Sequence, residues 1–290
     1  MLSSYFIHLL ITIGIYLVSA LSLQLACGFS GMLNFGHISF FCIGAYIYGY
    51  MTIIGAPFWL CFLAASAGTA LVAMVIAMLT GKLRGDYFSL TTLGFSYFVI
   101  ATILNWREVT NGPLGLPGIL RPDFLNNILN DDRYFLMFVL VGVILTYFFV
   151  SRLVASPLGK VMQAVRDDEL AAKILGKNTY KTKIISLSIS GFLVGFAGSL
   201  YAAYVMYIGP GGFYASEMLL LLCIVIFGGL ASIRGTVIST MILVLLPEIM
   251  RFVSLPTTIL GPGRQVLYSV LLLALIVYKP RGIDGKVELQ

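Results

Sequence analysis

The chain has 290 residues, of which 59% are apolar and only 10% are charged. A soluble domain carries about a quarter charged residues, so this composition excludes an ordinary water-soluble globular protein. The formal net charge is +6, but the basic residues do not form one patch with interleaved aromatic side chains, so nucleic-acid binding is not expected. The composition instead suits a protein whose solvent is lipid.

Long apolar segments, separated by short polar or Gly/Pro-containing breaks, run through the chain. A helix that crosses a bilayer needs roughly 20 mostly apolar residues. The fold class we predict is an all-α polytopic integral membrane protein with about 8–10 transmembrane helices, in a single transmembrane domain over residues 1–290. The first span is expected to be retained, because no Lys or Arg precedes it as in a signal peptide. The predicted spans are Tyr5–Cys27, Phe40–Ile54, Pro57–Thr80, Tyr87–Asn105, Tyr134–Val154, Ile184–Ile208, Met218–Ile233, Thr236–Phe252 and Val266–Tyr278.

The first break in the apolar pattern is GFSGMLNFG at residues 28–36. A break at membrane depth frees backbone groups, which must then be satisfied by protein or by a water-lined cavity. Two interpretations of Asn34, Gly36 and His37 stay open. These residues line a translocation pathway, or they form a tight interhelical turn with a capping Asn and an interfacial His. A metal or acid–base role for His37 is not expected, because no suitable ligands or carboxylates are spaced around it.

Ionisable residues are sparse in the predicted spans. His8 lies near the start of the first span, Glu217 lies at a span edge, and Glu248 lies near the end of the eighth span. Ion-coupled carriers hold ionisable groups at membrane depth, so this scarcity argues against a carrier. The sequence contains no catalytic or metal-binding constellation and no phosphate-binding G-x-x-x-x-G-K-[ST] loop. The chain is therefore predicted to be no enzyme, with no catalytic residue, no metal site and no cofactor of its own.

The basic residues are sorted by loop, which predicts the orientation of the chain. Thirteen of the eighteen Lys and Arg residues fall in four regions, and counting spans alternately places all four regions on one side. The positive-inside rule makes that side cytoplasmic, so the C-terminus and a loop at about 155–183 are predicted to be cytoplasmic. A loop at about 106–133 is predicted to face outward. The four regions are Lys82–Arg84, Arg152–Lys183, Arg234 and Lys279–Lys286.

The segment DDELAAKILGKN, residues 167–178, predicts a short helix within the most charged loop. Asp167 is a suitable N-cap, and Glu169 and Lys173 make a favourable i,i+4 ion pair. Gly176 predicts the helix end, so the helix is about eight residues and roughly 12 Å long. One apolar stripe runs along it, formed by Leu170, Ala171, Ile174 and Leu175. Such a stripe is typical of a helix lying on anionic lipid or of a helix docking into a partner's groove.

Several motifs in order resemble one transporter family. E-x-A-A-x-x-x-G, formed by Glu169, Ala171, Ala172 and Gly176, is similar to the cytoplasmic loop of ABC-importer permeases, with Leu170 as an extra residue before the Ala pair. The wider chain resembles the permeases of branched-chain amino-acid importers, and two segments, LRGDYF and NGPLGLPGI, resemble the M-type subunit in particular. The matching segments are GMLNFGHISFFCIGAY (31–46), LRGDYFSLTTLGF (83–95), TNGPLGLPGI (110–119), GGLASIRGTVIST (228–240) and LPEIMR (246–251).

The resemblance implies a function and a set of partners. The chain would be the membrane-spanning subunit of an ABC importer in the bacterial inner membrane, paired with a second, H-type permease. Two cytoplasmic ATPases using ATP-Mg would power it, and a periplasmic binding protein would deliver branched-chain or other apolar amino acids. Urea or a short amide is an alternative substrate, and a stand-alone channel or ion-coupled carrier is an alternative class. The implied ATPase-coupling helix comprises Asp168, Glu169, Leu170, Ala171, Ala172, Ile174, Leu175 and Gly176.

The predicted outer loop contains TNGPLGLPGI, which mixes Gly and Pro with Leu and Ile. This composition is typical of a well-ordered turn that packs on helix ends. The resemblance instead implies a surface that docks the binding protein or forms the mouth of the pathway. The residues concerned are Asn111, Gly112, Pro113, Gly115 and Gly118.

Overall fold

The computed structural model describes residues 2–83, 85–122, 131–252, 257–278 and 282–285. The predicted fold class is confirmed, because the described chain is almost entirely helical and its one sheet consists of two strands of two residues each. Six of the described helices are long and apolar enough to cross a membrane. Residues 123–130 of the predicted outer loop lie outside the described residues, as do Lys279, Arg281 and Lys286 of the basic C-terminal region.

The helices follow the predicted spans closely. The second is shorter than a typical span, with 17 residues, and the break before it begins with a five-residue π-helix. The α-helices are α1 (Leu2–Gln24), α2 (His37–Ile53), α3 (Phe58–Thr80), α4 (Asp86–Asn105), α5 (Arg107–Thr110), α6 (Asp132–Ala155), α7 (Pro157–Asp167), α8 (Glu169–Ile174), α9 (Thr179–Val205), α10 (Ala215–Gly228), α11 (Ile233–Phe252) and α12 (Thr257–Tyr278). The remaining elements are the π-helix η1 (Leu25–Phe29), the 3₁₀ turns η2 (Gly112–Leu114) and η4 (Pro210–Gly212), and the strands β1 (Leu116–Pro117) and β2 (Tyr207–Ile208).

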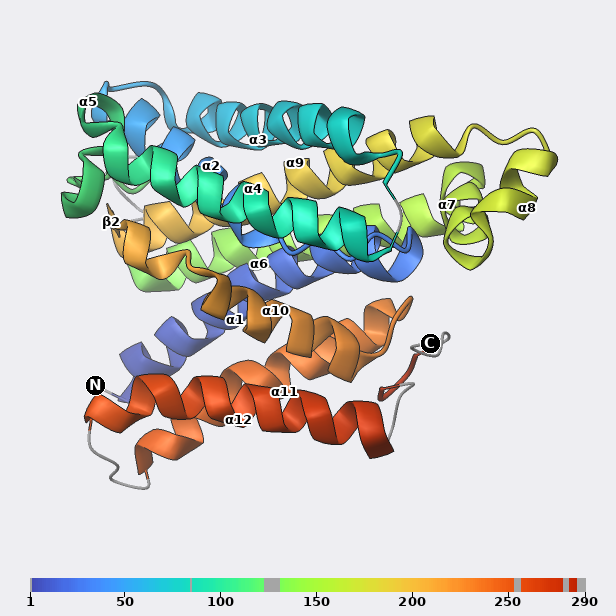
Figure 1. Ribbon diagram of the computed structural model, residues 1–290. Helices are drawn as coiled ribbons and strands as arrows, with labels where there is room; N and C mark the ends of the chain where they lie inside the picture. The colour runs from blue at the N-terminus through green and yellow to red at the C-terminus, as the bar shows by residue number, and fades with distance from the viewer. Residues whose placement is uncertain (1, 84, 123–130, 253–256, 279–281, 286–290) are drawn as a thin grey trace.

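Helix α1 lies between two groups of helices (Figure 1). On one side α9 packs along α2 and α3, with α4 against α2, and α6 packs against α1. On the other side α10 packs against α11 and α12, and α1 contacts both α10 and α11. The apolar core therefore runs along α1, which joins the two groups.

Glycines allow α9 to approach α2 closely. A Cβ atom at Gly44 would lie 2.5 Å from the carbonyl oxygen of Gly195, and one at Gly198 would overlap the carbonyl oxygen of Phe41. Helices in membranes associate through such small residues, because backbone contact replaces the hydrophobic driving force that is missing in lipid. The α2–α9 contact is therefore made by backbone at positions that no larger residue could occupy.

The two loops that were predicted to face opposite sides lie at opposite ends of the molecule (Figure 1). Helices α7 and α8 form one end, and α5 with the two short strands forms the other. Strands β1 and β2 pair antiparallel, with Leu116 opposite Ile208 and Pro117 opposite Tyr207. This pairing ties the outer loop to the segment after α9, a connection that the sequence did not predict.

Candidate functional site

The charged loop is built as two consecutive helices, α7 and α8. Ser156 caps α7, because its hydroxyl accepts a hydrogen bond from the Gly159 N–H at 3.3 Å, and Pro157 occupies the first helical position. Buried Met162 and Val165 face the rest of the protein. Helix α7 therefore docks the loop onto the membrane-spanning core, and α8 follows it after a sharp turn at Asp168.

The predicted N-cap at Asp167 is wrong, and the cap is Asp168. One carboxylate oxygen of Asp168 accepts hydrogen bonds from the N–H groups of Leu170 at 2.8 Å and Ala171 at 3.0 Å. Asp167 instead ends α7, where its carboxylate pairs with the Arg166 guanidinium at 2.7 Å. Helix α8 consequently has six residues rather than about eight. The prediction that it ends before Gly176 is confirmed, since that glycine has a φ of +74°.

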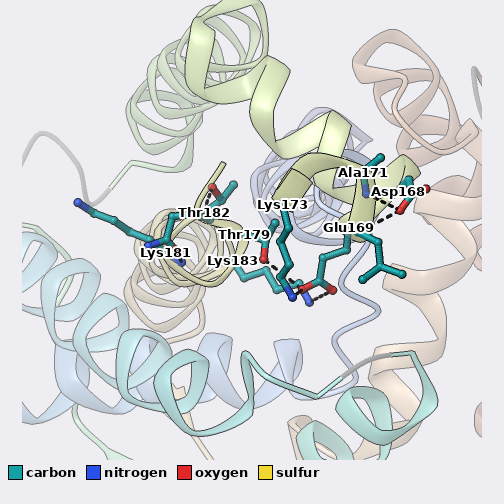
Figure 2. A network of polar contacts seen from close by, with 10 residues as sticks. Asp168, Glu169, Ala171, Lys173, Thr179, Lys181, Thr182 and Lys183 are labelled. Carbon is teal, nitrogen blue, oxygen red and sulfur yellow. Dashed lines mark hydrogen bonds and ion pairs between the residues drawn. The ribbon is translucent and has the colours of Figure 1, made fainter. Parts of the chain in front are cut away.

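Glu169 is the centre of an ion-pair network (Figure 2). Its carboxylate lies 2.9 Å from the Lys173 Nζ, which confirms the predicted i,i+4 pair, and 2.8 Å from the Nζ of Lys183 on α9. The Thr179 hydroxyl donates a third bond at 3.1 Å. Burial by itself would raise the pKa of this carboxyl, but these bonds and the charge of Lys183 outweigh burial and lower the pKa to about 2. Glu169 is therefore a carboxylate that clamps α8 to α9.

The apolar stripe of α8 points away from the protein. Leu170 is 57% exposed, Ile174 86% and Leu175 76%, and Ala171 is also exposed. Ala172 is buried against the protein, so the two alanines of the motif lie on different faces. A stripe of large apolar side chains held outward by a partly buried ion pair is a surface with the chemistry of a docking site.

The charged loop also contacts the break that follows the first span. Arg166 Nη1 donates a 2.8 Å hydrogen bond to the carbonyl oxygen of Gly28, in the π-helix η1. Met162 packs with Leu25 and Phe29 of η1 and with Ala231 of the α10–α11 turn, in a cluster separate from the main core. A π-helix leaves backbone groups outside the regular ladder, and Arg166 satisfies one of them. The charged loop, which we define as α7 and α8, is thus joined to the end of the first span.

A second link continues from η1 to the α10–α11 turn. The Gln24 side-chain amide donates hydrogen bonds to the carbonyl oxygens of Gly229 at 2.9 Å and Ser232 at 3.3 Å. The Ser232 hydroxyl in turn donates to the Asp284 carboxylate at 2.7 Å. Sequence reasoning missed Gln24 and took Arg166 and Lys183 only as flanking basic residues. The signal that could have indicated these contacts was the position of a Gln and of basic residues beside predicted breaks between helices.

Asn34, Gly36 and His37, at the end of the first break, are buried. Asn34 accepts a 2.9 Å hydrogen bond from the Gly36 N–H, so it closes a turn, while the N-cap position of α2 is Gly36 without a side-chain cap. His37 Nε2 lies 2.9 Å from the Ser22 hydroxyl and 3.2 Å from the Ser19 carbonyl oxygen on α1. The tight turn of the second interpretation is present, but Asn34 bonds within that turn and does not occupy the N-cap position of α2, and His37 is buried against α1. His37 fastens the start of α2 to α1, and a place for these residues in a translocation pathway stays a prediction.

The glycines of the predicted outer loop allow backbone conformations that most residues do not adopt. Asn111, Gly112, Gly115 and Gly118 all have positive φ values, which only glycine and Asn adopt readily. A Cβ atom at Gly115 would overlap the carbonyl oxygen of Ile208 on β2. The residues predicted for this loop are thus close together, far from α8. Within the described residues, no three His, Cys, Asp or Glu side chains are grouped closely enough to hold a metal ion.

Comparisons with known proteins place these features in a family. A family model described as "Branched-chain amino acid transport system / permease component" matches residues 5–278. The chain is 30% identical over 293 residues to the high-affinity branched-chain amino acid transport system permease protein LivM of Escherichia coli, covering 93% of this chain and 67% of the relative. It is 26% identical over 320 residues to the probable branched-chain amino acid transport permease protein LivM of Methanocaldococcus jannaschii, covering 95% and 92%.

A more distant relative has a different substrate in its name. The chain is 26% identical over 194 residues to the guanosine ABC transporter permease protein NupQ of Bacillus subtilis, covering 61% of this chain and 60% of the relative. A search of solved structures found no match. The family match over nearly the whole chain agrees with the multi-pass helical fold, and we conclude that the chain belongs to the permease-component family of branched-chain amino acid transport systems.

Proposed function

We propose that this permease moves branched-chain or other apolar amino acids and that the charged loop of α7 and α8 couples it to an ATPase. The observation that carries the coupling role is the outward stripe of α8, with Ile174 86% exposed while Glu169 ties the opposite face to α9. A helix that only filled space would bury these side chains, since burial of each would contribute about 1.5–3 kcal/mol. The substrate class follows the names of the LivM relatives.

In the proposed mechanism, a displacement of α8 is transmitted to the membrane-spanning helices through specific side-chain contacts. An ATPase that closes on α8 pushes the helix, and Glu169 passes the displacement to Lys183 on α9 at 2.8 Å. The same displacement reaches α1 through the Arg166–Gly28 hydrogen bond. Because α1 lies between the two groups of helices, a shift at its end changes how they meet. The pathway then opens on one side and closes on the other.

The proposed assembly contains several other chains. A second, H-type permease completes the pore, two ATPases bind ATP-Mg on the cytoplasmic side, and a periplasmic protein delivers the substrate. This chain itself binds no nucleotide, which is supported by the lack of a phosphate-binding loop in its sequence. The bacterial inner membrane, with α7, α8 and the C-terminus in the cytoplasm, is supported by the distribution of Lys and Arg.

Substitution of the stripe tests the coupling role. In Ile174→Asp, a charge replaces an apolar contact, so we expect association with the ATPase to weaken by about tenfold or more, with membrane insertion unchanged. Leu114→Asp is the matched control, because Leu114 is likewise exposed, at 73%, but belongs to η2, which follows α5 at the end of the molecule opposite α8. Co-purification of the tagged ATPase measures the effect. An Ile174→Asp protein that retains full association would instead assign the stripe to the lipid surface.

Reconstitution separates this proposal from the alternatives. The complete complex in proteoliposomes should accumulate labelled leucine only with ATP and the binding protein. Uptake of urea or a short amide in place of leucine would establish the alternative substrate. Transport by this chain alone, at the rate of the complete complex, would establish a stand-alone channel or carrier.

A further inference from the structure

A cavity of about 440 Å³ lies beside the N-terminal half of α1 and the last turn of α9. Residues of α1, α9, α10, α11 and α12 line it, so it lies where the two groups of helices meet. Sites for small molecules usually have volumes of about 300–1,000 Å³ and mostly apolar walls with a few placed polar groups. This cavity has that size, and its wall combines apolar side chains with a larger share of polar groups.

Three ionisable side chains that are far apart in the sequence line this cavity together. They are His8 from α1, Glu217 from α10 and Glu248 from α11. Ionisable groups within membrane-spanning helices are costly, and they generally mark a pathway for substrates or ions. In the sequence each lay toward one end of a different predicted span, and their scarcity argued against an ion-coupled carrier. The fold gathers them at one cavity.

Hydrogen bonds hold the polar wall of the cavity in place. His8 Nδ1 and the Tyr204 hydroxyl are 2.6 Å apart, and the two rings stack with centroids separated by 5.5 Å. The Tyr5 hydroxyl donates to the Glu248 carboxylate at 2.7 Å. The guanidinium carbon of Arg121 also lies 5.6 Å from the centroid of the Tyr204 ring. This contact connects the wall of the cavity to the predicted outer loop. His8, Tyr204 and Glu248 are therefore positioned by their neighbours before any ligand enters.

A proline shapes the same wall. Pro247 lies inside α11 and lines the cavity, and it has no N–H to bond the carbonyl four residues earlier, that of Leu243. The Tyr268 hydroxyl of α12 lies 3.4 Å from that carbonyl oxygen and donates to it. The proline thus interrupts the α11 ladder beside Glu248, and α12 supplies the replacement donor.

We propose that this cavity binds an α-amino acid with an apolar side chain, through its ammonium group. The carboxylates of Glu217 and Glu248 accept from the ammonium, since a carboxylate has about four acceptor sites and can serve a ligand as well as a neighbour such as Tyr5. Apolar side chains complete the binding surface for the ligand, namely Leu9, Ile15, Leu220 and Val244. This inference rests on the proposed function and adds a selection rule, because urea, short amides and guanosine carry no ammonium group.

Protection of an introduced thiol tests the cavity directly. Thr12 lines it, and the four native cysteines are buried, so Thr12→Cys gives this chain one accessible reporter, whose labelling is read on this chain's band of the purified complete complex. We expect leucine and 3-methylbutylamine, which both carry the ammonium group, to slow maleimide labelling at position 12. We expect 4-methylpentanoate, which lacks it, to have no effect. Gln265→Cys on α12 is a second reporter at the same cavity.

Charge-neutral variants complete the test. Glu217→Gln with Glu248→Gln should raise the protective leucine concentration by about tenfold or more, because bonds between charged groups are the strong ones. Glu108→Gln is the matched control, an exposed glutamate of α5 that does not line the cavity. Equal protection by 4-methylpentanoate, or unchanged protection in the double variant, overturns the proposal. ATP-driven leucine uptake by the unmodified complex tests the proposed function separately from the cavity. If that complex takes up no leucine, the proposed function is wrong; if it takes up leucine but the protection results above fail, only the cavity proposal is wrong.

Discussion

Arg166 donates a 2.8 Å hydrogen bond from its Nη1 to the carbonyl oxygen of Gly28, across 138 positions of sequence. Gly28 lies in the π-helix that ends the first span, and Arg166 lies in the last turn of α7. The bond therefore joins the loop proposed to meet the ATPase to the helix that lies between the two groups of spans. A cation that holds a backbone carbonyl in a break is well suited to transmit movement, because the carbonyl has left the regular helical ladder.

Removal of this bond should uncouple transport from ATP hydrolysis. A hydrogen bond to a charged group contributes about 1.5–3 kcal/mol, so we expect Arg166→Met to lower leucine transported per ATP several-fold while the complex still assembles. Lys160→Met is the control, since Lys160 is exposed on the same helix. The ratio of labelled leucine taken up to phosphate released measures the effect. The same ratio in Arg166→Met and in the unmodified complex would rule out the role of this bond.

The capping residue of α8 should be Asp168 and not Asp167. Loss of an N-cap costs about 0.5–2 kcal/mol, so Asp168→Ala should speed hydrogen exchange at the amides of Leu170 and Ala171, which bond to its carboxylate. Asp168→Asn should keep most of the protection. Asp167→Ala should leave these two amides unchanged, because its carboxylate bonds to Arg166. Faster exchange after Asp167→Ala and not after Asp168→Ala would restore the original assignment.

Acid should loosen the α8–α9 contact through Glu169. The pKa of this carboxyl falls from an ordinary value of 4.5 to about 2 in the folded protein, so the unfolded segment takes up a proton first as the pH falls. Its contribution to stability is fully present above about pH 4.5 and is lost as the pH falls toward 2.

Hydrogen exchange of α8 against pH measures this effect, after correction for the intrinsic exchange rate. Glu169→Gln should be less protected at neutral pH and should show no such dependence between about pH 4.5 and 2. Lys181→Met is the control for loss of a charge in this region, because Lys181 is exposed and its removal leaves the buried Lys183 in place. A Glu169→Gln protein that keeps the acid dependence of the unmodified chain would assign it to another group.

Close packing of α2 on α9 should make Gly198 intolerant of a methyl group. A Cβ atom there would overlap the Phe41 carbonyl oxygen, and overpacking of this kind costs about 1–3 kcal/mol. Gly198→Ala should therefore lower the midpoint of thermal unfolding in detergent. Gly94→Ala is the matched control, since Gly94 is also helical but has open space around it, and it should be neutral or slightly stabilising. Equal midpoints for the two variants would contradict this packing.

Labelling from each side of the membrane should separate the two ends. Asn111 and Lys177 are both exposed and lie in loops at opposite ends, while the native cysteines are buried. Asn111→Cys should react with an impermeant thiol reagent added to intact spheroplasts. Lys177→Cys should react only after the membrane is opened. The reverse pattern would invert the proposed orientation.

The spans and the internal features of α8 were predictable from sequence because they depend on neighbours along the chain. Apolar runs predict helices in lipid, the Glu169–Lys173 pair follows from a spacing of four, and Gly176 ends a helix through its own backbone freedom. The N-cap was assigned one residue early, because two aspartates are adjacent and the choice depends on where α7 ends. Helix α7 ends at Asp167, and Asp168 is then left in the extended conformation that a cap requires.

Tertiary structure alone decided which distant groups meet. Lys183 reaches Glu169, Arg166 reaches Gly28, and Gln24 reaches the α10–α11 turn, although nothing in their spacing indicates a partner. His8, Glu217 and Glu248 were minor features of separate spans, and the fold brings them to one cavity. The physical reason is that helix formation depends on local backbone bonds and the surrounding lipid. Packing of helices depends instead on small residues such as Gly44 and Gly198, whose partners are chosen by the shape of the whole bundle.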